Sequence, residues 1–257
     1  MRLFLKLFFC FLLVGILLMV LVKPIWSYFF TKLPIPIALV GREPIFSNVF
    51  YNRLNAITQQ KLNVSKADLL EKLIFETKVE ISASKNQATL IAPQNLIEFD
   101  QEALKIDPLL NKAVNAQAQE DSVRFWYNSQ KKYHLKYYET AEFLKVAIGS
   151  GKSFTQLALD YSEDLPSKKL GGDLGGIKAK NLLFELQTPL LNLKLNEIMI
   201  LPSRLGLHLF QKYSQKIGET GEDVLYLKQI FLQTNDFYLW VEGETKNQKI
   251  KKLIPSL

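Results

Sequence analysis

The stretch that decides the fold is Ser153–Gly175, SFTQLALDYSEDLPSKKLGGDLG. It begins as a short amphipathic helix, since its apolar residues recur at three- and four-residue spacing on one face. These are Phe154, Leu157, Ala158 and Tyr161. Polar residues and Pro166 then end the helix. Three glycines within Gly171–Gly175 predict a backbone with positive φ, or a close approach to another segment.

A short strand is predicted further along, at Gly206-Leu207-His208-Leu209-Phe210. Because side chains alternate between the two faces of a strand, His208 lies on one face together with Phe210. A second strand is predicted at Ile198–Leu201, joined to the first by a turn at Pro202-Ser203-Arg204.

In this order the chain carries F-x-x-L-A-x-x-Y-S-x-D, G-G-D-L-G, L-K-x-x-E and G-x-H, which together resemble the parvulin-type peptidyl-prolyl isomerase domain. The resemblance implies an α+β fold with a small antiparallel sheet and flanking helices. Asn196 stands where the family has glycine in L-K-x-G-E. Asparagine tolerates left-handed backbone geometry best after glycine, so we expect this turn to be kept.

The resemblance also implies a site. By motif, His208 is the histidine of G-x-H, Asp164 takes the Cys/Asp position, and Ser203 matches the Ser/Thr ahead of the histidine. Gln229 stands for a second histidine. The implied catalytic set is therefore His208, Asp164, Ser203 and Gln229.

The implied pocket for the proline ring falls near Leu182 and Leu186, where the family more often has Met/Leu and Phe. Phe184 is the alternative aromatic after a two-residue slip. The departures at Gln229 and at the phenylalanine position put the catalytic rate in question and leave a peptide-binding groove possible.

One strand of the family is missing from its usual place. A parvulin domain begins with a central strand reading R-H-I-L, whereas here Trp126–Tyr138 has a helical pattern. Val224–Gln233 reads instead as a strand, and its Lys228–Phe231, KQIF, is similar to R-H-I-L. We interpret the domain as circularly rearranged, with its central strand at 224–233. An extra edge strand is the alternative.

Residues 1–30 are predicted to be a membrane anchor. Leu7–Val22 is uncharged and is flanked by Lys6 and Lys23, which can snorkel. A cleaved signal peptide is the alternative, but no A-x-A site precedes Ala38. We expect a single pass through the cell membrane, with the folded part extracytoplasmic.

Residues 31–130 predict a mainly helical module, with a helix over Lys66–Ser84 capped by Ser65. Val40–Ile45 followed by Leu70–Ile74 is similar to the N-terminal module of SurA-type chaperones; a helical domain without that role is the alternative. The parvulin-like domain is expected at 131–233. A closing helix and tail at 234–257 is expected to pack on the N-terminal module through Trp240 and Ile250.

The composition limits which metals, nucleic acids and nucleotides the protein is expected to bind. The 257 residues include one cysteine and two histidines, so a Cys-based zinc site is excluded and a metal site is not expected. The net charge of +7 comes from scattered basic residues, which predicts no nucleic-acid binding. Gly149–Ser153 looks like the end of a phosphate-binding loop, but Val146 replaces the first glycine and a helix precedes it, so no nucleotide is expected.

The predicted function is prolyl cis–trans isomerisation or assisted folding of unfolded or extended proline-containing chains, secreted or in the envelope. The X-Pro barrier of roughly 18–20 kcal/mol comes from amide resonance, and lowering it needs no cofactor. A non-catalytic module that holds extended peptide in the same groove is the alternative. A structural membrane-associated scaffold is a third interpretation.

Overall fold

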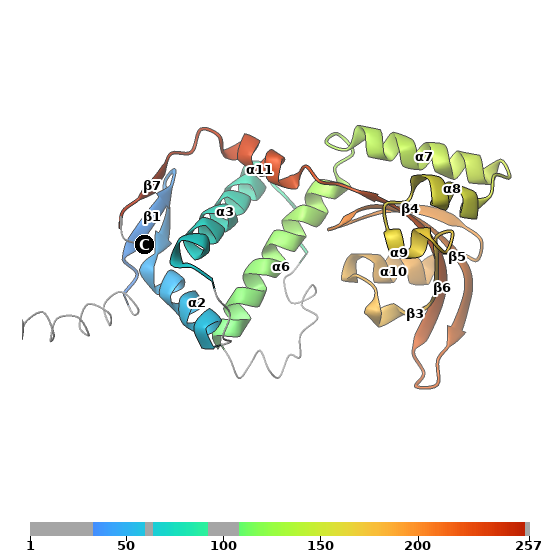
Figure 1. The fold of residues 1–257 in the computed structure, drawn as a ribbon, viewed down its shortest axis with the longest axis horizontal. Helices are drawn as coiled ribbons and strands as arrows, with labels where there is room; N and C mark the ends of the chain where they lie inside the picture. The colour runs from blue at the N-terminus through green and yellow to red at the C-terminus, as the bar shows by residue number, and fades with distance from the viewer. Residues whose placement is uncertain (1–32, 60–63, 92–107, 255–257) are drawn as a thin grey trace, which may run out of the picture. The chain divides into compact units, whose positions relative to one another are not determined.

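The computed structural model describes residues 33–59, 64–91 and 108–254 (Figure 1). The chain divides into two compact units. Unit 1 comprises Met1–Glu80, Asp107–Ala113 and Thr245–Leu257, and unit 2 comprises Ile81–Ile106 and Val114–Glu244. The predicted anchor at 1–30 lies outside the described residues. Within the described ranges, no helix has both the length and the apolar character needed to cross a bilayer.

Unit 1 holds a three-stranded sheet in the order β2-β1-β7. Its elements are β1 (Pro36–Val40), β2 (Glu43–Phe46), α2 (Ser47–Gln59), the first part of α3 (Lys66–Lys85) and β7 (Ile250–Lys252). Ser65 accepts a hydrogen bond from the Asp68 backbone N–H at 3.0 Å, which confirms the predicted N-cap. Glu43 and Pro44 belong to β2, an edge strand where proline is tolerated.

The segment after residue 233 forms a helix and a short strand. Residues 250–252 form β7, which pairs antiparallel with β1. Helix α11 (Phe237–Thr245) turns Trp240 toward Tyr127, which lies inside the range 31–130, and the two rings stack with centroids 4.7 Å apart. Ile250 is 43% exposed and joins β1 through backbone pairing.

Unit 2 is built on a four-stranded antiparallel sheet in the order β3-β6-β5-β4. Its strands are β3 (Asp173–Lys178), β4 (Ile198–Ser203), β5 (Gly206–Ile217) and β6 (Asp223–Gln233). Its helices, besides the end of α3 and α11, are α6 (Pro108–Ser129, from Val114 onward), α7 (Leu135–Gly149), α8 (Phe154–Tyr161), α9 (Leu165–Lys168), η1 (Ala179–Asn181) and α10 (Phe184–Asn192). β6 lies inside the sheet, paired with β3 on one side and β5 on the other.

Alternation along β5 sorts side chains between two layers. Leu207 and Leu209 face α7 and α8, where they pack with residues such as Leu144 and Leu157. Phe210 faces the opposite layer and packs with Leu186 of α10. Figure 1 shows α7 and α8 on one side of this sheet and α10 on the other. His208, two residues before Phe210, lies on the α10 side.

Two helices show local interruptions. The helical pattern that continues beyond Trp126–Tyr138 is divided at 130–134, between α6 and α7. Pro189 lies inside α10. That helix is held at its C-terminal end by the buried Lys212, whose ammonium donates to the carbonyl oxygens of Leu190 and Leu191 at 3.1 and 2.9 Å. A cation is favourable at this end of a helix dipole.

The interior place of β6 makes a prediction about folding. A chain ending after Lys216 loses β6, and with it the partner of both β3 and β5 and the buried Leu225 and Ile230. We expect this chain to lose the cooperative unfolding of unit 2 in urea, followed by circular dichroism. A chain ending after Gln233 keeps β6 and should retain a cooperative transition. Equal behaviour of the two chains would contradict a central role for β6.

Candidate functional site

The site centres on His208, whose ring is buried at 5% exposure and has a partner at each nitrogen. Nε2 lies 2.7 Å from Ser203 Oγ at the end of β4, and Nδ1 lies 3.1 Å from Gln229 Oε1 on β6. Gln229 Nε2 in turn donates to Asp164 Oδ2 at 2.9 Å. The four residues of the predicted catalytic set thus form one hydrogen-bonded chain across β4, β5, β6 and the segment after α8.

The direction of each hydrogen bond follows from chemistry. The Asp164 carboxylate only accepts, so Gln229 presents its amide N–H to it and its carbonyl oxygen to His208. Nδ1 of His208 must then carry the proton, which leaves Nε2 as an acceptor for the Ser203 hydroxyl. Ser203 Oγ itself accepts from the Leu205 backbone N–H at 3.0 Å. The chain therefore fixes a neutral imidazole in one tautomer.

Asp164 is fixed by a second hydroxyl. Ser167, three residues later in α9, donates to the same Oδ2 atom that accepts from Gln229. Ser167 is almost fully buried. Ser167 was not among the predicted site residues, although the D-x-x-S spacing resembles that of a helix-capping residue and its partner.

Two glycines allow the backbone to approach β6 closely beside the hydrogen-bonded residues. Gly172, at φ +85°, accepts a hydrogen bond from the Gln229 N–H at 2.8 Å, and a Cβ there would lie 2.5 Å from the Gln229 carbonyl oxygen. Gly206 is similarly crowded, since its Cβ would lie 2.4 Å from the Leu232 carbonyl oxygen. The predicted close approach at the G-G-D-L-G motif is thus toward β6. Asn196 has φ +64°, the left-handed geometry expected of it.

Aromatic rings cover His208. The Phe210 ring stacks on it, with centroids 5.2 Å apart and planes at 9°, and the Phe231 ring lies at 4.7 Å. Burial lowers the pKa of His208 to about 4, although the Gln229 hydrogen bond and the Asp164 charge act to raise it. The imidazole is therefore uncharged near neutral pH, in an apolar environment.

The predicted pocket residues make none of the hydrogen bonds that link Asp164, Gln229, His208 and Ser203. Leu182 and Leu186 are buried in the core formed by η1, α10 and the sheet, which also contains Phe210. Phe184, at the start of α10, is 40% exposed. In the part of the chain that the structure describes, no group of three or more His, Cys, Asp or Glu residues is arranged to hold a metal ion.

Comparison with known families adds the class of domain. Residues 104–216 match the PPIC-type PPIASE domain, the parvulin class of peptidyl-prolyl isomerases. The match confirms the parvulin-type domain that the motifs predict. It ends inside β5, so β6 and Gln229 lie beyond it.

Among individual proteins, the chain is similar to bacterial foldases. It is 40% identical to foldase protein PrsA 1 of Bacillus cereus over 73 residues, which cover 28% of this chain and 26% of that protein. It is 24% identical to PrsA 4 of the same species over 180 residues, covering 68% and 60%. It is 26% identical to PrsA of Geobacillus kaustophilus over 178 residues, covering 60% and 61%. The chain therefore spans less than two thirds of these relatives.

The low pKa of His208 predicts how stability depends on pH. An unfolded histidine titrates near about 6.5, so below this pH the unfolded chain binds a proton that the folded chain rejects. Stability should fall as the pH drops from about 6.5 to about 4, by at most roughly 3 kcal/mol, and this contribution should level off below.

Urea unfolding at about pH 7 and about pH 4.5 measures this contribution. His208→Gln cannot take up a proton and should show a smaller difference between the two pH values. Burial also lowers the pKa of His134, so the pH dependence that remains in His208→Gln includes a contribution from His134. A pH dependence that is unchanged in His208→Gln would show that His208 titrates normally.

Proposed function

We propose that this chain is a peptidyl-prolyl cis–trans isomerase that acts on unfolded or extended proline-containing polypeptides. The observation that carries the proposal is the hydrogen-bonded chain from Asp164 through Gln229 and His208 to Ser203. The match of residues 104–216 to the PPIC-type domain and the similarity to foldases support it.

The proposed mechanism needs no nucleophile. X-Pro rotation is accelerated when the site binds the twisted amide better than either planar form, and when it removes water from the amide. A neutral His208, packed with the Phe210 and Phe231 rings, gives the site a rigid and weakly polar wall for a proline ring. Its hydrogen bonds hold the ring in place, so that the wall need not reorganise during the rotation.

Exposed apolar residues favour a second candidate, a module that binds extended peptide without catalysis. Leu165 follows Asp164 directly and is 67% exposed, and Leu205, between Ser203 and His208, is 53% exposed. Apolar side chains on the segments that carry the site suit contacts with an unfolded client. Unit 1 would contribute further client contacts, in keeping with the resemblance of residues 38–110 to SurA-type modules.

Exchange of X-Pro peptides measured by NMR tests the first candidate. Residues 34–257 should accelerate exchange, and His208→Ala should lower kcat/KM by about tenfold or more, because the wall against the proline ring is lost. The exposed Glu219→Ala serves as the control. Equal rates in His208→Ala and Glu219→Ala would remove His208 from the mechanism.

Gln229→Leu separates the two candidates in the same assay. It breaks both hydrogen bonds of the glutamine, so an enzyme should lose rate while a binding groove should keep its affinity for peptide. No acceleration by the unmodified chain, together with suppressed aggregation of an unfolded client, would establish the binding module.

We also propose that residues 1–30 anchor the protein in the cell membrane with its folded part extracytoplasmic. The uncharged run Leu7–Val22 and the aromatic residues after Lys23 support this. The chain should remain with membranes through high-salt and alkaline washes, and protease added outside the cytoplasm should digest it. Release into the soluble fraction would contradict an anchor.

A further inference from the structure

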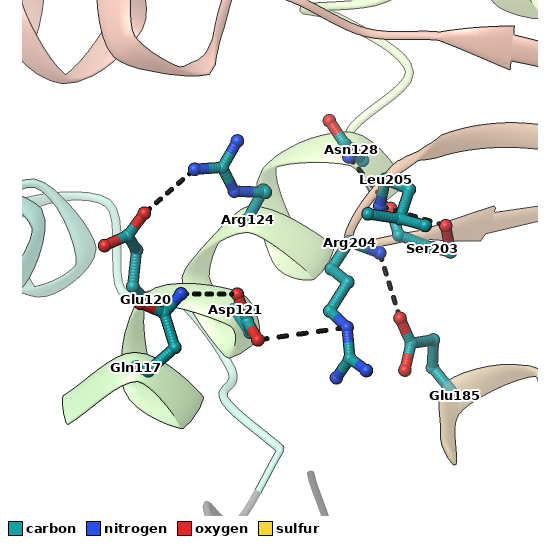
Figure 2. Close-up of polar contacts among 9 residues, drawn as sticks. All are labelled: Gln117, Glu120, Asp121, Arg124, Asn128, Glu185, Ser203, Arg204 and Leu205. Carbon is teal, nitrogen blue, oxygen red and sulfur yellow. Dashed lines mark hydrogen bonds and ion pairs between the residues drawn. The ribbon is translucent and has the colours of Figure 1, made fainter. Parts of the chain in front are cut away.

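Helix α6 reaches the site through one buried side chain. Asn128 is 2% exposed, and its amide bridges two strand ends. Nδ2 donates to the Ser203 carbonyl oxygen at 2.8 Å, and Oδ1 accepts from the Thr234 hydroxyl at 2.9 Å. Ser203 ends β4, and Thr234 directly follows β6. Figure 2 shows Asn128 beside Ser203 and Leu205.

Two further contacts, both made by Arg204, hold the turn after Ser203. The Arg204 backbone N–H donates to Glu185 Oε1 of α10 at 3.0 Å, and the Arg204 Nε atom lies 3.9 Å from Asp121 Oδ2 of α6 (Figure 2). Helices α6 and α10 thus both fix the backbone at the β4–β5 turn. Among these contacts, the bond from Asn128 is the one made to Ser203 itself.

Serine has a single short side chain, so the backbone of Ser203 determines where its hydroxyl lies. That hydroxyl must lie 2.7 Å from His208 Nε2, while the Gly206 carbonyl oxygen, at 3.5 Å, is a competing acceptor. A shift of the Ser203 carbonyl would therefore change the hydrogen bond on the histidine. The Asn128 amide resists such a shift because both of its ends are bonded.

We propose that Asn128 is a positioning residue for the Ser203–His208 pair. It holds the Ser203 carbonyl so that the hydroxyl donates to Nε2 and the His208 ring keeps one orientation. The inference rests on the proposed isomerase function for its effect on rate. Because Asn128 acts through Ser203, its loss should lower kcat and leave KM nearly unchanged.

The test compares two isosteric substitutions in the full chain. Asn128→Leu loses both amide bonds, whereas Thr234→Val loses only the bond to Oδ1 and keeps the one to Ser203. Asn128→Leu removes two buried hydrogen bonds and Thr234→Val removes one, so a merely structural role would lower the stability of both variants and leave kcat of the folded protein unchanged. We expect about a tenfold loss of kcat in Asn128→Leu, with exchange of a proline-containing tetrapeptide as the assay, and little change in Thr234→Val.

The ¹⁵N chemical shifts of His208 provide a readout that does not depend on catalysis. In Asn128→Leu the Nε2 shift should move toward that of an unbonded acceptor nitrogen, and in Thr234→Val it should stay. Equal loss of kcat in the two variants, or an unmoved Nε2 shift in Asn128→Leu, would overturn the proposal. If Asn128→Leu does not fold, Asn128→Ser, whose hydroxyl is too short to reach Ser203, is read in the same way.

The two proposals can fail separately. An unmodified chain that does not accelerate exchange refutes the isomerase function, and the ¹⁵N shifts then decide alone whether Asn128 positions Ser203. An active chain whose His208 shifts are the same in all variants refutes the positioning role and leaves the isomerase function standing.

Discussion

Unit 2 depends on one interaction set: the buried imidazole of His208 has a hydrogen-bond partner at each nitrogen, which avoids the cost of an unpaired polar atom at the centre of the sheet. β4 supplies Ser203 and β6 supplies Gln229, one from each neighbouring strand. Gln229 in turn requires Asp164, and the Gly172 carbonyl oxygen holds its backbone. The sheet order and the site are therefore a single arrangement, since displacing any of these strands leaves a buried polar group without its partner.

Gln229, in place of a second histidine, keeps the series of hydrogen bonds from Asp164 to Ser203 continuous but changes which protons can move along it. A pair of histidines can place its protons in more than one tautomer. An amide has one donor end and one acceptor end, and Asp164 decides which end faces it. The proton on His208 Nδ1 is thereby fixed. A site built in this way favours a fixed, uncharged wall over proton transfer, which fits a reaction that moves no proton and needs only rotation about one bond.

The parts that could be predicted from sequence are those with a local pattern. Ser65 as a cap, the left-handed Asn196 and the strand around His208 each follow from a few neighbouring residues. Asn128, Ser167 and β7 were missed because they act through contacts with distant residues and carry no periodicity. The place of Pro189 inside α10 opposes its local preference, and tertiary packing of Leu186 and Leu190 outweighs that preference.

The late position of β6 also bears on how unit 2 forms. In the usual parvulin order the central strand comes first and must wait for strands made much later in the chain. Here β4, β5 and β6 follow one another as a meander, joined by turns at 204–205 and 218–222. Their pairings are local in sequence, so the loop-closure entropy that they cost is small. Only the pairing of β3 with β6 spans a long segment, and it brings Gly172 against Gln229. The backbone contact that holds Gln229 therefore depends on the one non-local strand pairing of this sheet.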